Sequence, residues 1–128
     1  LSQISAVREC KDTRLLAVAA NVARQLGASA DCVATLDSAI KLEQHAALYV
    51  RRGMCREDLK DTAGATSDYK QAIERDAKFA PAHYYYALLT KASDKAKACK
   101  EIALAAELGG AQGIGPDAKK AKEDWGCK

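Results

Sequence analysis

The chain has 128 residues, which is the size of one domain, and only 5% of them are aromatic. Its formal net charge is +3 and its acidic residues are interspersed with basic ones, so the sequence lacks the clustered basic surface expected of a nucleic-acid-binding protein. Apolar runs stay well short of the ~20 residues of a membrane-spanning helix, and we expect no membrane span.

A lead-in over residues 1–12 precedes three units of similar length. Asp12 and Thr13 predict the N-cap of a first helix, because a short side-chain oxygen can accept hydrogen bonds from unpaired backbone N–H groups. Glycine and short polar residues then divide each unit into two helices. The units span 13–45 with a turn at 27–29, 46–79 with a turn at 61–64, and 80–110 with a turn at 93–94.

Residues 111–128 differ from these units. Their first part is a glycine-rich turn, which ends the preceding helix. Pro116 and Asp117 can start a last, lysine-rich helix that runs to about Trp125. Stacked helical units need a solubilising end, so we expect this helix to cap the structure.

The three units share a pattern with a period of roughly 34 residues, which is typical of helix-turn-helix repeats. In the first helix of each unit, a larger residue is followed four positions later by a small one, which predicts a close helix crossing. A small–large–small triplet recurs in each second helix. The pairs are Leu16 and Ala20, Tyr49 and Gly53, and His83 and Ala87; the triplets are Cys32, Leu36 and Ala39, then Ala65, Tyr69 and Ala72, then Ala98, Ile102 and Ala105.

At these residues the chain resembles the tetratricopeptide repeat family. The segment from Leu48 to Gly53, followed by Ala65, Tyr69 and Ala72, is close to the family pattern, although Ala77 replaces the usual proline. The resemblance implies an all-α fold: a right-handed α-solenoid of three helix-turn-helix repeats, closed by the capping helix. It also implies a concave peptide-binding groove and no catalysis.

The family register assigns residues of each first helix to the groove. The basic residue set with which some family members grip acidic C-termini is matched only at Asn21, so we do not expect that activity. Some of the apolar groove positions could instead be core residues. Among three successive tyrosines, we expect Tyr84 in the groove and Tyr86 in the core. The predicted groove residues are Asn21, Arg24, Val50, Met54, Glu57, Tyr84, Leu88 and Lys91.

The five cysteines form no zinc-site spacing, and a buried free thiol is the simplest interpretation of each. In the implied repeat geometry, however, the start of one second helix lies against the C-terminal half of the next first helix. This relation predicts disulfides Cys32–Cys55 and Cys99–Cys127, with Cys10 left over. Such bonds would favour an oxidising compartment, such as a periplasm or a secretory lumen.

The sequence therefore predicts a non-catalytic protein–protein interaction module that binds a partner peptide and needs no cofactor or metal. His45 and His83 lie at unit junctions, where packing or surface roles are expected, and no nucleophile–base set is recognisable. The alternative is a structural component that self-associates, as a homo-oligomer, or docks within a cell-envelope or secretion assembly.

Overall fold

The computed structural model describes residues 11–127, apart from the side chains of residues 111 and 112. Within that range it contains helices and no strand, which confirms the predicted all-α class. The elements are α2 (Thr13–Gln25), α3 (Ser29–Leu42), α4 (Ala46–Asp58), α5 (Thr62–Arg75), α6 (Ala80–Thr90), α7 (Lys95–Leu108), the 3₁₀ turn η1 (Gly109–Gln112) and α8 (Gly115–Asp124).

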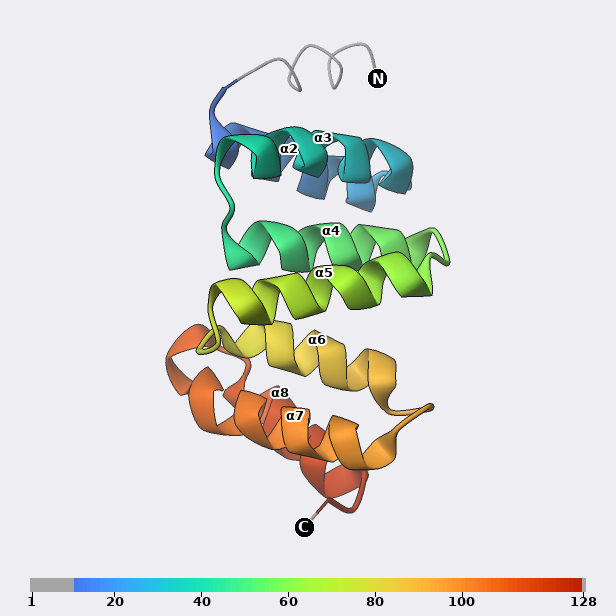
Figure 1. Ribbon diagram of the computed structural model, residues 1–128, viewed down its shortest axis with the longest axis vertical. Helices are drawn as coiled ribbons and strands as arrows, with labels where there is room; N and C mark the ends of the chain where they lie inside the picture. Colours follow the sequence, from blue (N-terminus) through green and yellow to red (C-terminus); the bar gives the residue numbers. More distant parts are fainter. Residues whose placement is uncertain (1–10, 128) are drawn as a thin grey trace.

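The helices pair into hairpins that stack along one axis. α2 packs on α3, α4 on α5 and α6 on α7, while α3 also packs on α4 and α5 on α6. Helix α8 packs against α7 at the end of the stack (Figure 1). An amphipathic hairpin leaves one apolar side uncovered, so each hairpin completes its core only by stacking on the next.

Aspartate side chains begin three of the helices. The Asp12 carboxylate accepts hydrogen bonds from the backbone N–H groups of Arg14 and Leu15, as predicted for an N-cap. Asp94 caps α7 in the same way. The predicted turn at 61–64 is wrong in its position, because Asp61 is the N-cap of α5 and the residues after it are already helical.

Gly53 lies against the ring of Tyr69, where α4 packs on α5. A Cβ atom built on Gly53 would lie 2.6 Å from Cε1 of Tyr69, whose side chain is fully buried. The small residues of the other crossings, Ala20 and Ala87, are also buried. The small residues of the sequence pattern are therefore buried, and at Gly53 a neighbouring ring takes the space that a side chain would occupy.

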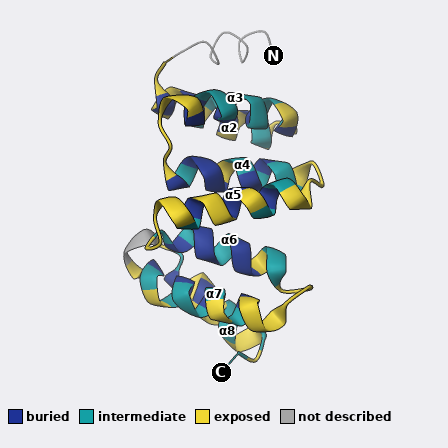
Figure 2. Cartoon of the chain, viewed as in Figure 1, coloured by how far each residue is buried: buried dark blue, intermediate teal, exposed yellow. Residues whose placement is uncertain are grey.

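The core follows the hairpin interfaces (Figure 2). A buried ion-pair network adds to it: Asp68, 1% exposed, lies 2.7 Å from Nη2 of Arg52 and 2.9 Å from Nη1 of Arg56. Asp37 of α3 accepts a further bond from Arg52. The network thus connects the first hairpin to the second.

Two disulfides also connect neighbouring units, and they join the pairs predicted from the sequence. Cys32 of α3 is bonded to Cys55 of α4, with Cα atoms 6.2 Å apart. Cys99 of α7 is bonded to Cys127, which follows α8, with Cα atoms 5.5 Å apart. The leftover Cys10 lies outside the described residues. Each bond ties an end unit of the stack to its neighbour.

Candidate functional site: a cavity between the first helices

A cavity of about 270 Å³ opens between α2, α4 and α6, the first helices of the three hairpins. Its wall is mainly apolar, and its polar side chains carry one amide, two guanidinium groups and the hydroxyl of Tyr85. This composition can bind an apolar group and orient it by a few hydrogen bonds. The lining residues of this central cavity are Ala20, Asn21, Arg24, Cys32, Ala47, Val50, Arg51, Met54, Cys55, Phe79, Pro81 and Tyr85.

Four of the eight predicted groove residues line the central cavity. Asn21 and Arg24 come from α2, and Val50 and Met54 come from α4. Val50 is buried, with 4% exposure, while Met54 is half-buried. Val50 therefore belongs both to the core and to the cavity wall, so the groove and core interpretations of this position both apply.

The other predicted positions on α6 lie outside this cavity. Tyr84 packs among residues of the C-terminal core cluster, and burial followed by the carboxylate of Asp117 raises its pKa. The Lys91 ammonium lies 4.9 Å from the ring centroid of Trp125. Leu88 is 42% exposed. Helix α8 and the residues after it therefore contact part of the α6 face that was expected to be open.

Tyr85, one position along, lies where Tyr84 was predicted, beside the cavity. Its ring lines the cavity and stacks on Tyr69, with centroids 6.1 Å apart. Tyr86 is buried, with 4% exposure, as expected for a core residue. Successive helix positions differ by ~100°, so an assignment that is one position off on α6 puts Tyr84 where Tyr85 lies.

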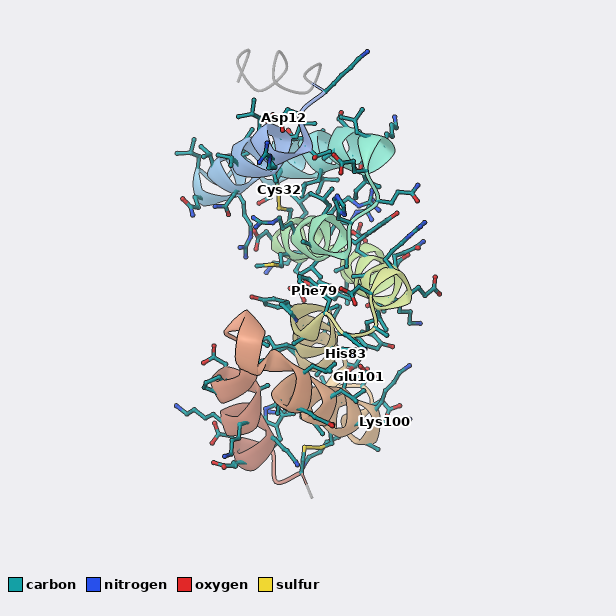
Figure 3. All side chains as sticks on the ribbon, turned by 90° about the vertical axis from the view of Figure 1, so that its left-hand side faces the viewer. Asp12, Cys32, Phe79, His83, Lys100 and Glu101 are labelled. Carbon is teal, nitrogen blue, oxygen red and sulfur yellow. A yellow bond between two sulfur atoms is a disulfide. The ribbon has the colours of Figure 1, made fainter. Side chains whose placement is uncertain are left out.

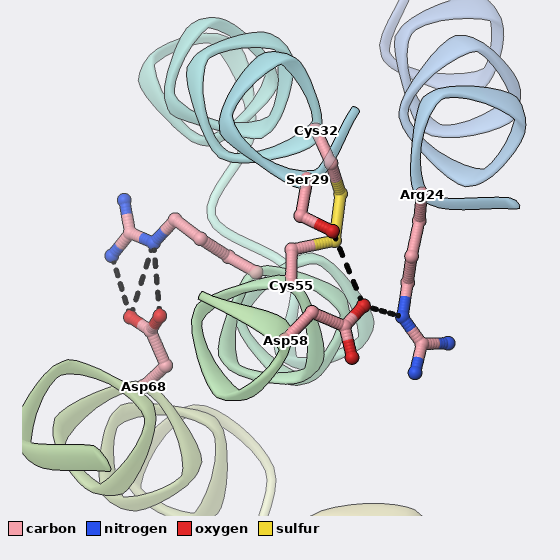
Figure 4. The surroundings of a disulfide bond; sticks show 7 residues. Arg24, Ser29, Cys32, Cys55, Asp58 and Asp68 are labelled. Atoms are coloured by element: carbon pink, nitrogen blue, oxygen red, sulfur yellow. Dashed lines mark hydrogen bonds and ion pairs between the residues drawn. A yellow bond between two sulfur atoms is a disulfide. The ribbon is translucent and has the colours of Figure 1, made fainter. Parts of the chain in front are cut away.

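Arg24 is held at the rim of the cavity by an ion pair. Its Nε lies 2.8 Å from Oδ2 of Asp58, and the Ser29 hydroxyl donates to the same oxygen at 3.3 Å. Figure 4 shows these side chains around the Cys32–Cys55 bond. The disulfide and the ion pair together fix α2 and α3 against α4.

Glu57 also lies away from the cavity. Its carboxylate accepts a hydrogen bond from the Tyr69 hydroxyl at 3.0 Å, and burial raises its pKa. The same hydrogen bond, together with burial as the main cause, raises the pKa of Tyr69. Glu57 thus orients a core tyrosine.

Sequence reasoning missed several lining residues, including Phe79, Tyr85 and Arg51. Phe79 is the last residue before α6, so a register that counts only helix positions omits it. Cys32 and Cys55 could have been recognised as lining residues, because the predicted disulfide between α3 and α4 lies beside the surface that α2 and α4 share.

The histidines take part in structural contacts. His83 is 4% exposed; its Nδ1 lies 2.6 Å from Oε2 of Glu101 and its Nε2 lies 2.7 Å from the carbonyl oxygen of Ala77 (Figure 3). Exposed His45 contacts Glu43. Across the described residues, no group of three or more His, Cys, Asp or Glu side chains is placed to hold a metal.

Comparison with known proteins gives structural similarity only. No family model and no curated protein matches the sequence. The type III secretion translocator chaperone SycD of Yersinia enterocolitica is similar with a TM-score of 0.79 and 18% identity, over 88% of each chain. SycD in complex with a peptide of the translocator YopD gives a TM-score of 0.76 and 18% identity, over 88% of this chain and 90% of that one.

A second similar structure is the first TPR of Spaghetti (RPAP3), bound to the HSP90 peptide SRMEEVD. Its TM-score is 0.77 and its identity is 17%, over 89% of this chain and 90% of that one. The hairpin stack, the small residues at the crossings and these similarities agree. The chain therefore has the helical solenoid fold of tetratricopeptide-repeat-like proteins.

Proposed function

We propose that this chain is a non-catalytic module that binds a peptide segment of a protein partner in the central cavity. The observation that carries the proposal is the cavity itself, which is formed jointly by α2, α4 and α6 and has a mainly apolar wall. Val50, Met54 and Tyr85 would receive an apolar side chain of the peptide. Asn21 and Arg51 would hydrogen-bond to its backbone or polar groups.

The fold neighbours support this function. SycD has been seen with a YopD peptide, and the RPAP3 domain with an HSP90 peptide. We also propose that the three hairpins are three repeats with the boundaries 13–45, 46–79 and 80–110. In the part of the chain that the structure describes, no helix is both long enough and apolar enough to cross a membrane.

The test uses Met54→Glu, which places a carboxylate in the cavity wall. Met54 is half-buried, so the glutamate can reach solvent and the fold should survive. Peptides selected by the wild-type chain from a random library should bind the variant at least about tenfold more weakly, since a charge would have to be desolvated.

Leu88→Glu is the matched control. It introduces the same carboxylate on an exposed apolar position of α6, outside the cavity. Binding should stay unchanged in this variant. Equal affinity of wild type and Met54→Glu, with unchanged helical circular dichroism in both, would contradict the cavity as the binding site.

A second function, self-association, is favoured by one specific surface. Leu15, Val18, Val22 and Leu26 of α2 recur on one face of the helix and are 47–75% exposed. A contiguous apolar stripe of this kind is unusual on a monomer and often marks an interface. A molar mass by light scattering that rises with concentration, and falls back in Val18→Asp, would support this candidate.

We further propose an oxidising compartment, such as a periplasm or a secretory lumen, as the site of action. The two disulfides support it, because structural disulfides form and persist under oxidising conditions. The intact mass measured with and without reductant, after isolation with free thiols blocked, tests whether both bonds exist in the native protein.

A further inference from the structure

The central cavity continues into a second hollow along the same face of α4. Ala47 and Arg51 line both spaces. The second hollow, here called the arginine hollow, lies between the N-terminal parts of α2 and α4. It is lined by Thr13, Arg14, Ala17, Glu43, His45, Ala47, Leu48 and Arg51.

The guanidinium groups of the two arginines in this hollow have no polar partner among the described residues. Arg14 and Arg51 are both exposed, and neither side chain makes an ion pair or hydrogen bond with any described residue. The other arginine of the central cavity, Arg24, is paired with Asp58, and Arg52 is paired with Asp68. The hollow therefore presents two free guanidinium groups beside an apolar cavity.

One carboxylate among the described lining residues opposes them. Glu43 accepts a hydrogen bond from the Thr13 hydroxyl at 2.7 Å, and its other oxygen lies 2.7 Å from Nε2 of His45. The Thr13 bond, followed by the His45 bond, lowers the pKa of Glu43, so this group is ionised at neutral pH. It is already satisfied on both oxygens, and the two arginines leave the hollow with an excess of positive charge.

We propose that Arg14 and Arg51 form an anion subsite that binds an acidic side chain of the peptide held in the central cavity. The inference rests on the proposed function. A guanidinium group binds a carboxylate through two parallel hydrogen bonds, which fixes direction as well as charge. The preferred ligand is a segment with an apolar anchor and an aspartate or glutamate close to it.

The positions of the lining residues along α4 set the expected spacing between the apolar anchor and the acidic residue of the peptide. Val50 and Met54 lie on the cavity side, and Ala47 and Arg51 lie about one helical turn, ~5.4 Å, toward the arginine hollow. An extended peptide rises ~3.3 Å per residue, so the acidic residue falls about two positions from the anchor.

The experiment selects peptides from a random library with the full wild-type chain. We expect an apolar residue with Asp or Glu about two positions away. Replacing that acid by its amide should weaken binding about tenfold or more, as expected when a charge-assisted hydrogen bond is lost. The loss should shrink as salt is added, because the arginines are exposed.

Variants of the chain test whether Arg51 causes the difference in affinity between the acid and amide peptides. Arg51→Ala should remove most of the discrimination between the acid and amide peptides, and Arg51→Lys should keep only part of it. Lys70→Ala removes an exposed cation from α5 outside both spaces, and should keep the discrimination intact.

A neutral or basic consensus, or discrimination that survives Arg51→Ala, would overturn this inference while leaving peptide binding in place. Failure to select any peptide would overturn the proposed function together with it.

Discussion

Replacing Gly53 by alanine should test the close crossing of α4 and α5 quantitatively. The added Cβ would lie 2.6 Å from Cε1 of Tyr69 and 3.0 Å from Cδ1 and Cζ, well inside ordinary van der Waals contact. The ring cannot easily move away. It is fully buried, its hydroxyl is bonded to Glu57, and its face is stacked on Tyr85.

Overpacking of this kind costs ~1–3 kcal/mol. The higher helix propensity of alanine offsets ~0.5–1 kcal/mol of that cost. The free energy of unfolding should therefore fall by up to ~2.5 kcal/mol. Urea denaturation followed by circular dichroism measures this fall as a lower midpoint at an unchanged m-value.

Two companion variants make the assay decisive. Gly110→Ala adds a Cβ in open space and should change stability by only a few tenths of a kcal/mol. Tyr69→Leu removes the ring, so its cost and that of Gly53→Ala should be less than additive when combined. A Gly53→Ala chain clearly more stable than wild type, or additive costs in the double variant, would refute the packing argument.

Three further predictions concern stability. Replacing Cys32 and Cys55 by alanine should lower the free energy of unfolding by ~3 kcal/mol, measured by urea denaturation, because a crosslink spanning 23 residues restrains the unfolded chain. Thr35→Val should leave stability unchanged or raise the thermal midpoint, because it removes a fully buried hydroxyl that has no hydrogen-bond partner among residues 11–127; a clear decrease would contradict this. Burial raises the pKa of Glu57 above its ordinary value of 4.5, so the folded state binds this proton more tightly than the unfolded state does. The resulting stabilisation is fully present below pH 4.5 and is lost as the pH rises through the raised pKa. Glu57→Gln should remove that decline in urea midpoints while keeping an acceptor for Tyr69.

The fold could be predicted from the sequence because the packing constraint is itself visible there. Gly53 and Ala87 are small at buried positions, and the ring of Tyr69 fills the space beside Gly53 where a larger side chain would overpack. The Cys32–Cys55 disulfide could be predicted for a similar reason, because stacking brings the second helix of one hairpin, α3, against the first helix of the next, α4.

The site could be predicted only in part, because it depends on details that a repeat pattern does not contain. The period gives the face of α6, but it does not show that Tyr84 packs against the C-terminal cluster while Tyr85 lines the cavity. Glu57 has the position of a groove residue, yet its half-buried carboxylate accepts a hydrogen bond from the core residue Tyr69. Arg24 is similarly paired with Asp58, the last residue of α4, across the contact between α2 and α4.

The most direct test of the account is a map of the backbone amide chemical shifts that change when a selected peptide binds the wild-type chain. If the peptide binds in the central cavity, the changes will be concentrated on the surrounding faces of α2, α4 and α6, at Asn21, Val50, Arg51, Met54 and Tyr85. Changes concentrated on the exposed α2 stripe or on α5 and α7, with those five amides unaffected, would contradict it.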